Sequence, residues 1–308
     1  MKKEQWIFKG YGELPLYAVC WLPEGEVKGV LQVTHGMTEH IDRYEEFAQF
    51  MNNQGIAVAG FDLRGHGHHP GNRQVASLGE NGWEASLEDM HLFLACLQKR
   101  FEKVPYYLLG FSLGSFLVRE YLNRWPENLA GAVIMGTGSQ PGLILSVIMK
   151  LVQGQIKKAG ADNTTAFVRQ LSFGTYNQKC KPNRTQADWL CADDAQLDLY
   201  LADPLVRADI SAGLFFQLLS SMKRTGMAET YTGWNKALPV LLLSGQQDPV
   251  GDGGKGVLAV REKMQQAGIF NVTLQLLENA RHDLLHEKCS GAADAAQDLI
   301  LQWMREQV

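Results

Sequence analysis

The chain contains few cysteines, and they form no pattern that would support a cross-linked or metal-bound fold. Five cysteines are scattered along its 308 residues with no C-x-x-C pair among them: Cys20, Cys96, Cys180, Cys191 and Cys289. Disulfide frameworks use paired cysteines, and zinc sites use closely spaced ones. We therefore expect reduced thiols and a cytoplasmic protein.

Long hydrophobic runs and blocks of like charge are missing as well. The longest apolar stretch, residues 143–152, is interrupted by Ser146 and Lys150 and is too short to cross a bilayer. The charged start of the chain is not followed by an apolar segment, so no signal peptide is expected. The net charge of −4 is spread over both signs without a basic block. This argues against nucleic acid as a partner, and no obligatory protein partner is evident.

Strand-like and helix-like segments alternate over most of the chain. The composition, 45% hydrophobic and 20% charged, is ordinary for a globular protein of this size. The alternation predicts an α/β fold in which helices cover both faces of a mostly parallel sheet. The predicted strands cover residues 6–8, 16–21, 29–34, 56–62, 106–109, 130–136, 239–244 and 272–277. The predicted helices cover residues 42–53, 83–101, 115–123, 256–267 and 292–307.

Between residues 139 and 235 this alternation stops. The segment contains helix-like runs at residues 142–158, 163–171, 193–201 and 211–222, with loops between them. We interpret it as a helical cap, or lid, inserted into an α/β core made of residues 1–138 and 236–308. The apolar face of the first run is interpreted as core of the cap. Transient contact of the cap with a membrane or micelle surface is the alternative.

A serine between two glycines follows one of the predicted strands. The stretch Gly110-Phe111-Ser112-Leu113-Gly114 lies between an apolar run and a helix-like run, which is the context of a nucleophile elbow. Glycine at either side lets strand and helix approach closely, so that the Ser112 hydroxyl is exposed. The Leu113 N–H is then free to bind developing negative charge. The competing interpretation is a glycine-bounded turn with an ordinary hydroxyl.

A carboxylate and a histidine follow the last two predicted strands. Asp248 comes directly after one of them, and His282 lies in the loop after the other. The order Ser, Asp, His is that of α/β-hydrolases, and catalytic groups of parallel sheets gather at the carboxyl ends of strands. Asp283 and Asp252 are the alternatives for the acid, and His286 is the alternative for the base.

The loop after an early strand is the expected source of a second oxyanion donor. It reads His35-Gly36-Met37-Thr38-Glu39-His40. Gly36 allows the backbone to approach the site, and the Met37 N–H is the expected donor. His35 is expected to brace the loop, because its use as the base would need a different order of elements.

Ordered motifs in the chain resemble the monoacylglycerol lipase/lysophospholipase family of α/β-hydrolases, a group that also carries the name serine aminopeptidase S33. The motifs are HGMTEHIDRY at residues 35–44, FDLRGHG at 61–67 and GFSLG at 110–114. The resemblance covers nearly the whole chain, including the inserted cap. The chain departs from the family at His68-His69-Pro70, where a small hydroxyl residue is usual.

The resemblance implies a role for each residue of the predicted site. Ser112 would be the nucleophile, Asp248 the acid and His282 the base. The backbone N–H groups of Met37 and Leu113 would form the oxyanion hole. The residues that support this loop would be His35, Gly36, Glu39 and Arg43, of which Glu39 and Arg43 lie near the acyl-ester pocket in the family.

Further motifs are interpreted as structural, and no metal or organic cofactor is expected. Residues 251–256 fit G-x-G-x-x-G, but a dinucleotide site would need them near the start of a βαβ unit. We interpret them as a flexible loop before a helix. His66, His68 and His69 lack the cysteines or carboxylates that would complete a metal site, so we interpret them as a polar turn.

These observations predict a serine carboxylester hydrolase with a mobile or semi-mobile cap. Its substrates would be small lipid-like esters, such as a monoacylglycerol or a lysophospholipid. The same residues would also serve a thioesterase, an acyltransferase or a prolyl aminopeptidase, for which Glu229 and Asp193 are available to hold a free amine. A non-catalytic binding protein with the hydrolase fold is the remaining alternative.

Overall fold

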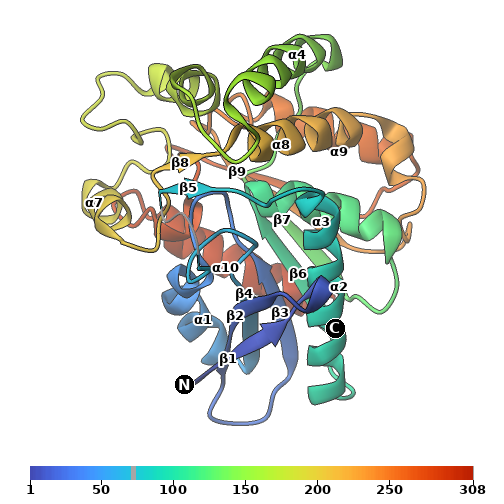
Figure 1. Cartoon of the computed structure of the whole chain (residues 1–308). Helices are drawn as coiled ribbons and strands as arrows, with labels where there is room; N and C mark the ends of the chain where they lie inside the picture. Colours follow the sequence, from blue (N-terminus) through green and yellow to red (C-terminus); the bar gives the residue numbers. More distant parts are fainter. Residues whose placement is uncertain (71–73, 308) are drawn as a thin grey trace.

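A computed structural model describes residues 1–70 and 74–307 of the chain, and its centre is an eight-stranded sheet (Figure 1). The strand order is β1-β2-β4-β3-β6-β7-β9-β10. The strands are β1 (Lys2–Lys9), β2 (Pro15–Leu22), β3 (Gly29–Thr34), β4 (Ile56–Phe61), β6 (Tyr106–Phe111), β7 (Gly131–Met135), β9 (Val240–Gly245) and β10 (Val272–Leu277). Pairing is antiparallel for β1 with β2 and for β2 with β4, and parallel from β4 to β10.

Helices cover both faces of this sheet, which explains why its central strands are continuous apolar runs. Every residue of β3, β6, β7 and β9 is buried. One apolar cluster packs the sheet against α2 (Gly82–Arg100), α3 (Leu113–Arg124) and α9 (Lys255–Gln266). A second cluster packs it against α1 (Glu45–Asn52) and α10 (Ala292–Arg305). The predicted α/β class with a mostly parallel sheet is confirmed.

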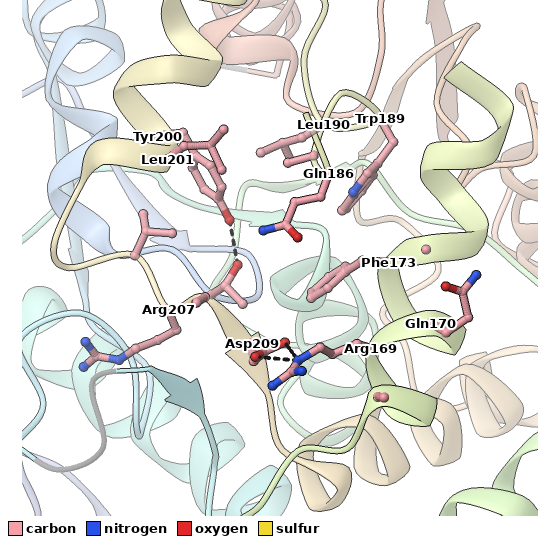
Figure 2. Close-up of a pocket in the computed structure, with 16 residues that line it drawn as sticks. Arg169, Gln170, Phe173, Gln186, Trp189, Leu190, Tyr200, Leu201, Arg207 and Asp209 are labelled. Atoms are coloured by element: carbon pink, nitrogen blue, oxygen red, sulfur yellow. Dashed lines mark hydrogen bonds and ion pairs between the residues drawn. The ribbon is translucent and has the colours of Figure 1, made fainter. Parts of the chain in front are cut away.

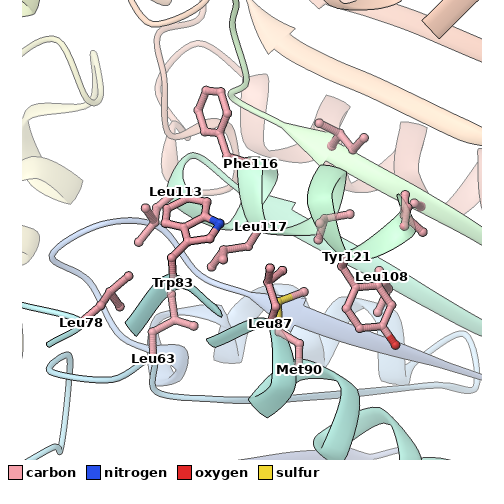
Figure 3. Close-up of a cluster of buried hydrophobic side chains, with 14 of the residues drawn as sticks. Leu63, Leu78, Trp83, Leu87, Met90, Leu108, Leu113, Phe116, Leu117 and Tyr121 are labelled. Atoms are coloured by element: carbon pink, nitrogen blue, oxygen red, sulfur yellow. The ribbon is translucent and has the colours of Figure 1, made fainter. Parts of the chain in front are cut away.

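The first cluster supports the helix that follows the predicted nucleophile. In Figure 3, Trp83, Leu87 and Met90 of α2 lie against Leu113 and Leu117 of α3. These side chains are almost completely buried. Because the start of α3 is packed in this way, the turn that carries Ser112 is held in place.

A group of helices lies between β7 and β9 in the chain and stands above the carboxyl ends of the parallel strands (Figure 1). Its longer helices are α4 (Gly142–Ala159), α7 (Asp194–Ala202) and α8 (Ala212–Thr225). Between α4 and α7, a short helix α5 (Ala166–Arg169) runs through a π-helical turn η3 (Gln170–Gly174) into α6 (Thr175–Asn177). Short 3₁₀ segments complete the chain: η1 (Tyr11–Glu13), η2 (Ile41–Tyr44), η4 (Gln178–Cys180), η5 (Ala228–Tyr231) and η6 (Leu284–His286). Among the described residues, no helix has both the length and the apolar character that a membrane span requires.

The structure differs from the sequence-based expectations in several elements. The helix expected at residues 42–53 is divided into η2 and α1, and the one expected at residues 163–171 is short and becomes π-helical. A two-stranded sheet that was not predicted pairs β5 (Val75–Ala76) with β8 (Asp209–Ile210) in parallel. Strands of two residues carry no periodicity that a sequence could reveal.

The apolar face of α4 is the clearest correction. We interpreted it as core of the cap, but Leu143, Ile144, Val147 and Leu151 are 85%, 52%, 60% and 50% exposed. The opposite side of the helix, which includes Leu145 and Val152, is buried against α8. The helix therefore presents an apolar strip to the outside in the described structure.

Candidate active site

Ser112 occupies a strained turn between β6 and α3. Its backbone has φ +50° and ψ −113°, a conformation that residues with a side chain rarely adopt. A Cβ atom on Gly114 would lie 2.0 Å from the Thr34 carbonyl oxygen, and one on Gly110 would lie 2.4 Å from the Gly114 oxygen. Only glycine fits at both places. The two glycines of the motif thus permit the close approach of strand, helix and the β3 loop that projects Ser112 from the sheet.

Asp248 and His282 meet beyond the ends of β9 and β10. The Nδ1 atom of His282 lies 2.8 Å from Oδ2 of Asp248. The Asp248 carboxylate also accepts hydrogen bonds from the Val250 N–H at 2.8 Å and from the Ser244 hydroxyl at 3.1 Å. Both residues of the pair are buried, with exposures of 0% and 1%. The carboxylate is therefore fixed in place and can orient the imidazole.

The His282 ring lies between two aromatic side chains, and its second nitrogen makes no hydrogen bond within the described residues. Its centroid is 4.9 Å from that of Phe111 and 5.1 Å from that of Trp189. The Nε2 atom is buried and has no hydrogen-bond partner among the described residues. Ser112 and His282 line the same small pocket, together with Met37. The structure thus brings the three predicted catalytic residues to one place, with Nε2 as the atom that can accept the serine proton.

The alternative acids and base have other partners. Asp283 accepts hydrogen bonds from Arg43 at 2.8 Å and from Nδ1 of His286 at 2.7 Å. Burial opposes ionisation of Asp283, but the charges of His286 and Arg43 outweigh it and hold the pKa of Asp283 well below its ordinary value. The Nε2 atom of His286 lies 2.9 Å from the Arg43 carbonyl oxygen. Asp252 is half exposed and pairs with Lys179. These groups lie around the site without reaching the His282 Nδ1 atom.

His35 fixes the direction of the Met37 amide. Its Nε2 atom accepts a hydrogen bond from the Leu63 N–H at 2.9 Å, so its Nδ1 atom carries the proton and donates to the Gly36 carbonyl oxygen at 2.7 Å. A peptide unit is planar and trans, so the Met37 N–H points away from His35. Burial lowers the pKa of His35, which keeps the ring neutral as this pattern requires. With both ring nitrogens engaged, His35 has no free nitrogen with which to act as the base.

The expected oxyanion donors are open. In the described part of the chain, no hydrogen bond engages the N–H of Met37 or of Leu113. Leu113 is the first residue of α3, where the helix dipole favours negative charge. Met37 lines the pocket together with Ser112, and Leu113 follows Ser112 directly in the chain. The arrangement can therefore stabilise a negative oxygen beside the Ser112 hydroxyl.

Glu39 and Arg43 form a buried network beneath the Met37 loop. The Oε1 atom of Glu39 accepts hydrogen bonds from the Gly36 N–H at 2.6 Å and from the Tyr44 hydroxyl at 2.9 Å. Its other oxygen pairs with Arg43, which also reaches Asp283. Burial works against the charge on Arg43, but Asp283 and Glu39 outweigh it and raise the pKa of Arg43. The network supports the Met37 loop, and the charge of Arg43 is paired with Glu39 and Asp283.

A cavity of about 440 Å³ opens from the site into the inserted helices (Figure 2). It shares Thr38, Phe173, Trp189, Leu190 and Tyr200 with the small pocket over Ser112. Figure 2 shows Phe173, Trp189 and Leu190 around the cavity and the Arg169–Asp209 ion pair at one end. The cavity is thus apolar near the serine and polar at its far end. Among the described residues, no group of side chains could hold a metal ion.

Sequence reasoning missed the residues that the inserted segment contributes to the site. Phe173, Trp189, Leu190 and Tyr200 line the pocket over Ser112, but none of them belongs to a motif. Aromatic residues within an otherwise polar segment are the only sequence signal that they give. Their position depends on the packing of η3, α7 and the loop between them.

Comparison with known proteins identifies relatives over nearly the whole chain. The family described as serine aminopeptidase, S33, matches residues 25–289. The monoglyceride lipase of Rattus norvegicus is 26% identical over 294 residues, which are 95% of this chain and 88% of that protein. A carboxyl esterase from Bacillus coagulans has a TM-score of 0.90 at 23% identity, with 100% of both chains covered. A monoglyceride lipase variant from Saccharomyces cerevisiae, solved with a substrate analogue, has a TM-score of 0.76 at 14% identity, with 100% of this chain and 96% of that one covered.

Proposed function

Because this chain belongs to the serine aminopeptidase S33 family of α/β-hydrolases, we propose that it is a serine hydrolase of lipid-like carboxylic esters. One observation carries the proposal: His282 and Ser112 line the same pocket, Asp248 holds one nitrogen of His282, and the other nitrogen has no partner among the described residues. A buried imidazole with a single free nitrogen is suited to proton transfer with the serine.

The reaction proceeds through an acyl-enzyme. Nε2 of His282 takes the Ser112 proton as Oγ attacks the ester carbonyl, and the N–H groups of Met37 and Leu113 bind the negative oxygen that forms. The imidazolium, stabilised by Asp248, gives its proton to the leaving alcohol. Water then enters, loses a proton to His282 and attacks the acyl group. The bond between the acyl carbon and Ser112 Oγ breaks as His282 returns this proton to Oγ, which releases the acid and restores Ser112.

The cavity in the cap supports a substrate with an apolar chain. Its wall next to the serine is formed by Phe173, Trp189 and Leu190, which suit the carbon chain of an acyl group. Curated relatives of the chain are monoglyceride lipases. Glu229 and Asp193, which the aminopeptidase alternative would use, are not among the residues that line either pocket. We therefore favour the ester over the peptide.

The test is hydrolysis of p-nitrophenyl esters from acetate to long acyl chains, with Ser112→Ala alongside. We expect wild-type activity that rises with chain length until the cavity is full. In Ser112→Ala we expect a loss on the order of 10⁶-fold in kcat. A folded wild-type protein that hydrolyses none of these esters would refute the proposal. Full activity of Ser112→Ala would refute the proposal as well.

We also propose that the cap contacts lipid surfaces through α4. Its exposed strip of Leu143, Ile144, Val147 and Leu151 is accompanied by Lys150, Lys157 and Lys158, which are exposed too, and the helix has no acidic residue. An apolar strip flanked by lysines suits the interface of an anionic membrane or micelle. The site of action that we propose is cytoplasmic, for which the free state of all five cysteines is the support.

Co-sedimentation with vesicles tests this contact. We expect the protein to bind vesicles that contain phosphatidylglycerol more tightly than pure phosphatidylcholine. The double variant Leu143→Ser/Val147→Ser should bind about tenfold more weakly, because apolar area no longer leaves water. Phe270→Ser is the matched control, since Phe270 is 73% exposed and lies outside the inserted segment. Equal binding by the double variant and the control would exclude α4 as the contact.

A further inference from the structure

The end of α7 and the chain that follows it contact the predicted oxyanion loop at several points. The Tyr200 hydroxyl lies 2.7 Å from Oγ1 of Thr38, and the Arg207 N–H donates to the Thr38 carbonyl oxygen at 2.8 Å. Oδ2 of Asp203 lies 2.8 Å from Nε2 of His40. The Arg43 guanidinium lies over the Tyr200 ring, 4.8 Å from its centroid. A segment of the cap is thus attached to the part of this loop that follows Met37.

Two of these contacts involve Thr38. It follows Met37 directly and has φ +70°, a left-handed conformation that is unfavourable for a β-branched residue. The Thr38 hydroxyl has a single proton, which it donates to the Met37 carbonyl oxygen. The hydrogen bond with Tyr200 therefore has Tyr200 as its donor. Burial raises the pKa of Tyr200 to about 12, so the phenol keeps the proton that this bond needs.

The peptide units on the two sides of Met37 are held from different parts of the molecule. The core holds the unit before it through the bond between His35 and the Gly36 carbonyl oxygen. The unit after it is held by the Thr38 hydroxyl, which in turn accepts the proton of Tyr200 from the cap. The dashed line that leaves the Tyr200 hydroxyl in Figure 2 marks this contact. Without Tyr200, the Thr38 hydroxyl would lose its hydrogen bond to the cap and would be free to turn away from the Met37 carbonyl oxygen.

We propose that Tyr200 is a positioning residue for the oxyanion hole, acting through Thr38 on the Met37 amide. The cap then has a part in the chemical step besides enclosing the substrate. The inference rests on the proposed function, since it concerns the step in which the ester carbonyl becomes an oxyanion. An amide displaced by a fraction of an ångström binds the developing charge less well, whereas the bound ester is affected little.

Tyr200→Phe tests the proposal with little disturbance. The variant keeps the ring over Arg43 and removes only the hydroxyl that faces Thr38. Tyr106→Phe is the matched control, because its hydroxyl also bonds to neighbouring groups (the carbonyls of Leu97 and Phe101) but lies at the start of β6, away from Ser112. The substrate is p-nitrophenyl acetate, whose acyl group is too short to occupy the cap cavity.

We expect kcat of Tyr200→Phe to fall about tenfold with KM unchanged, less than the loss of a whole oxyanion donor. Affinity for butylboronic acid, whose tetrahedral adduct with serine mimics the transition state, should fall by the same factor. Tyr106→Phe should change neither quantity. A purely structural role of Tyr200 would lower the melting temperature and leave kcat and the boronate affinity of the folded protein intact.

A double-mutant cycle identifies the route. Thr38→Val removes the acceptor of the Tyr200 bond and should lower kcat at least as much as Tyr200→Phe, and adding Tyr200→Phe to it should cost nothing more. Thr38→Ser restores the hydroxyl and should regain most of the activity. Additive losses in the double variant would overturn the inference, as would a folded Tyr200→Phe protein with full kcat and boronate affinity. A wild-type protein that hydrolyses no ester would instead overturn the proposed function and this inference with it.

Discussion

The two parts of the cap contact the core in different ways. Helices α4 and α8 pack on each other and on α3 through apolar side chains, among them Leu145, Val152 and Leu219. The segment between them, residues 163–210, has an apolar cluster with Val250 and, in addition, directed polar bonds to the loops of the proposed site. These bonds tolerate less displacement than hydrophobic contacts do.

The polar part is attached to the loop that carries His282. The Leu190 carbonyl oxygen accepts hydrogen bonds from the N–H groups of His282 at 3.1 Å and Asp283 at 2.7 Å. Arg281 donates to the Asp188 carbonyl oxygen at 2.5 Å. Together with the Tyr200 contact, these bonds connect the segment to both loops of the proposed active site. If the proposed function holds, movement of this part disturbs catalysis more than movement of α4 does.

The apolar part has polar contacts with the core as well, such as those of Ser221 and Arg224 with Glu120, and Arg119 makes the contacts at its two ends. Arg119 of α3 is completely buried and donates to Thr137 and Gly138 where the insertion begins. It also donates to Thr225 and Tyr231 where the insertion returns to the core. A single side chain of α3 thereby holds both ends of the inserted segment.

The largest effect on stability is expected from Arg119→Leu. It leaves the oxygens at both ends of the insertion without their donor, so the free energy of unfolding should fall by about 3 kcal/mol in a urea titration. Arg124→Leu on the same helix is the control, because its pair with Glu84 is exposed and worth little. Equal stability of the two variants would show that Arg119 does not hold the cap.

A smaller effect, on catalysis, is expected from Arg281→Ala. Loss of its bond to Asp188 loosens the attachment of the cap beside His282, so kcat for p-nitrophenyl acetate should fall about tenfold. Arg184→Ala is the control, since its ion pairs with Asp194 and Asp198 lie within the cap. If Arg281→Ala retained full kcat, the polar attachment would have no catalytic consequence.

The effect that is smallest near neutral pH concerns the core side of the oxyanion loop and its response to acid. Burial, with His35 nearby, lowers the pKa of His66 from the ordinary 6.5 to about 3. Between these values the unfolded chain binds a proton that the folded protein does not, so stability falls as the pH falls from 6.5 towards 3. His66→Gln should remove up to about 1.4 kcal/mol per pH unit of this decline, measured by urea unfolding at several pH values. If His66→Gln left the dependence of the unfolding free energy on pH unchanged, this role of His66 would be contradicted.

The same comparison separates what the sequence could predict from what it could not. Ser112, Asp248 and His282 follow strand ends that local patterns identify, so the sheet itself determines where they lie. Thr38 and Tyr200 are 162 residues apart, and only the packing of the cap brings them together. Exposure of Leu143 and the pairing of Val75 with Asp209 depend on the same packing. His66, interpreted as part of a polar turn, is fully buried, because burial of a turn is set by what covers it.

The structure of the protein after reaction with a long-chain alkyl fluorophosphonate tests the central claim most directly. The account predicts phosphorus bonded to Ser112 Oγ and a phosphoryl oxygen about 3 Å from the amides of Met37 and Leu113. The alkyl chain should lie in the cavity between Phe173, Trp189 and Leu190. An adduct on another residue, or a phosphoryl oxygen turned away from both amides, would contradict it.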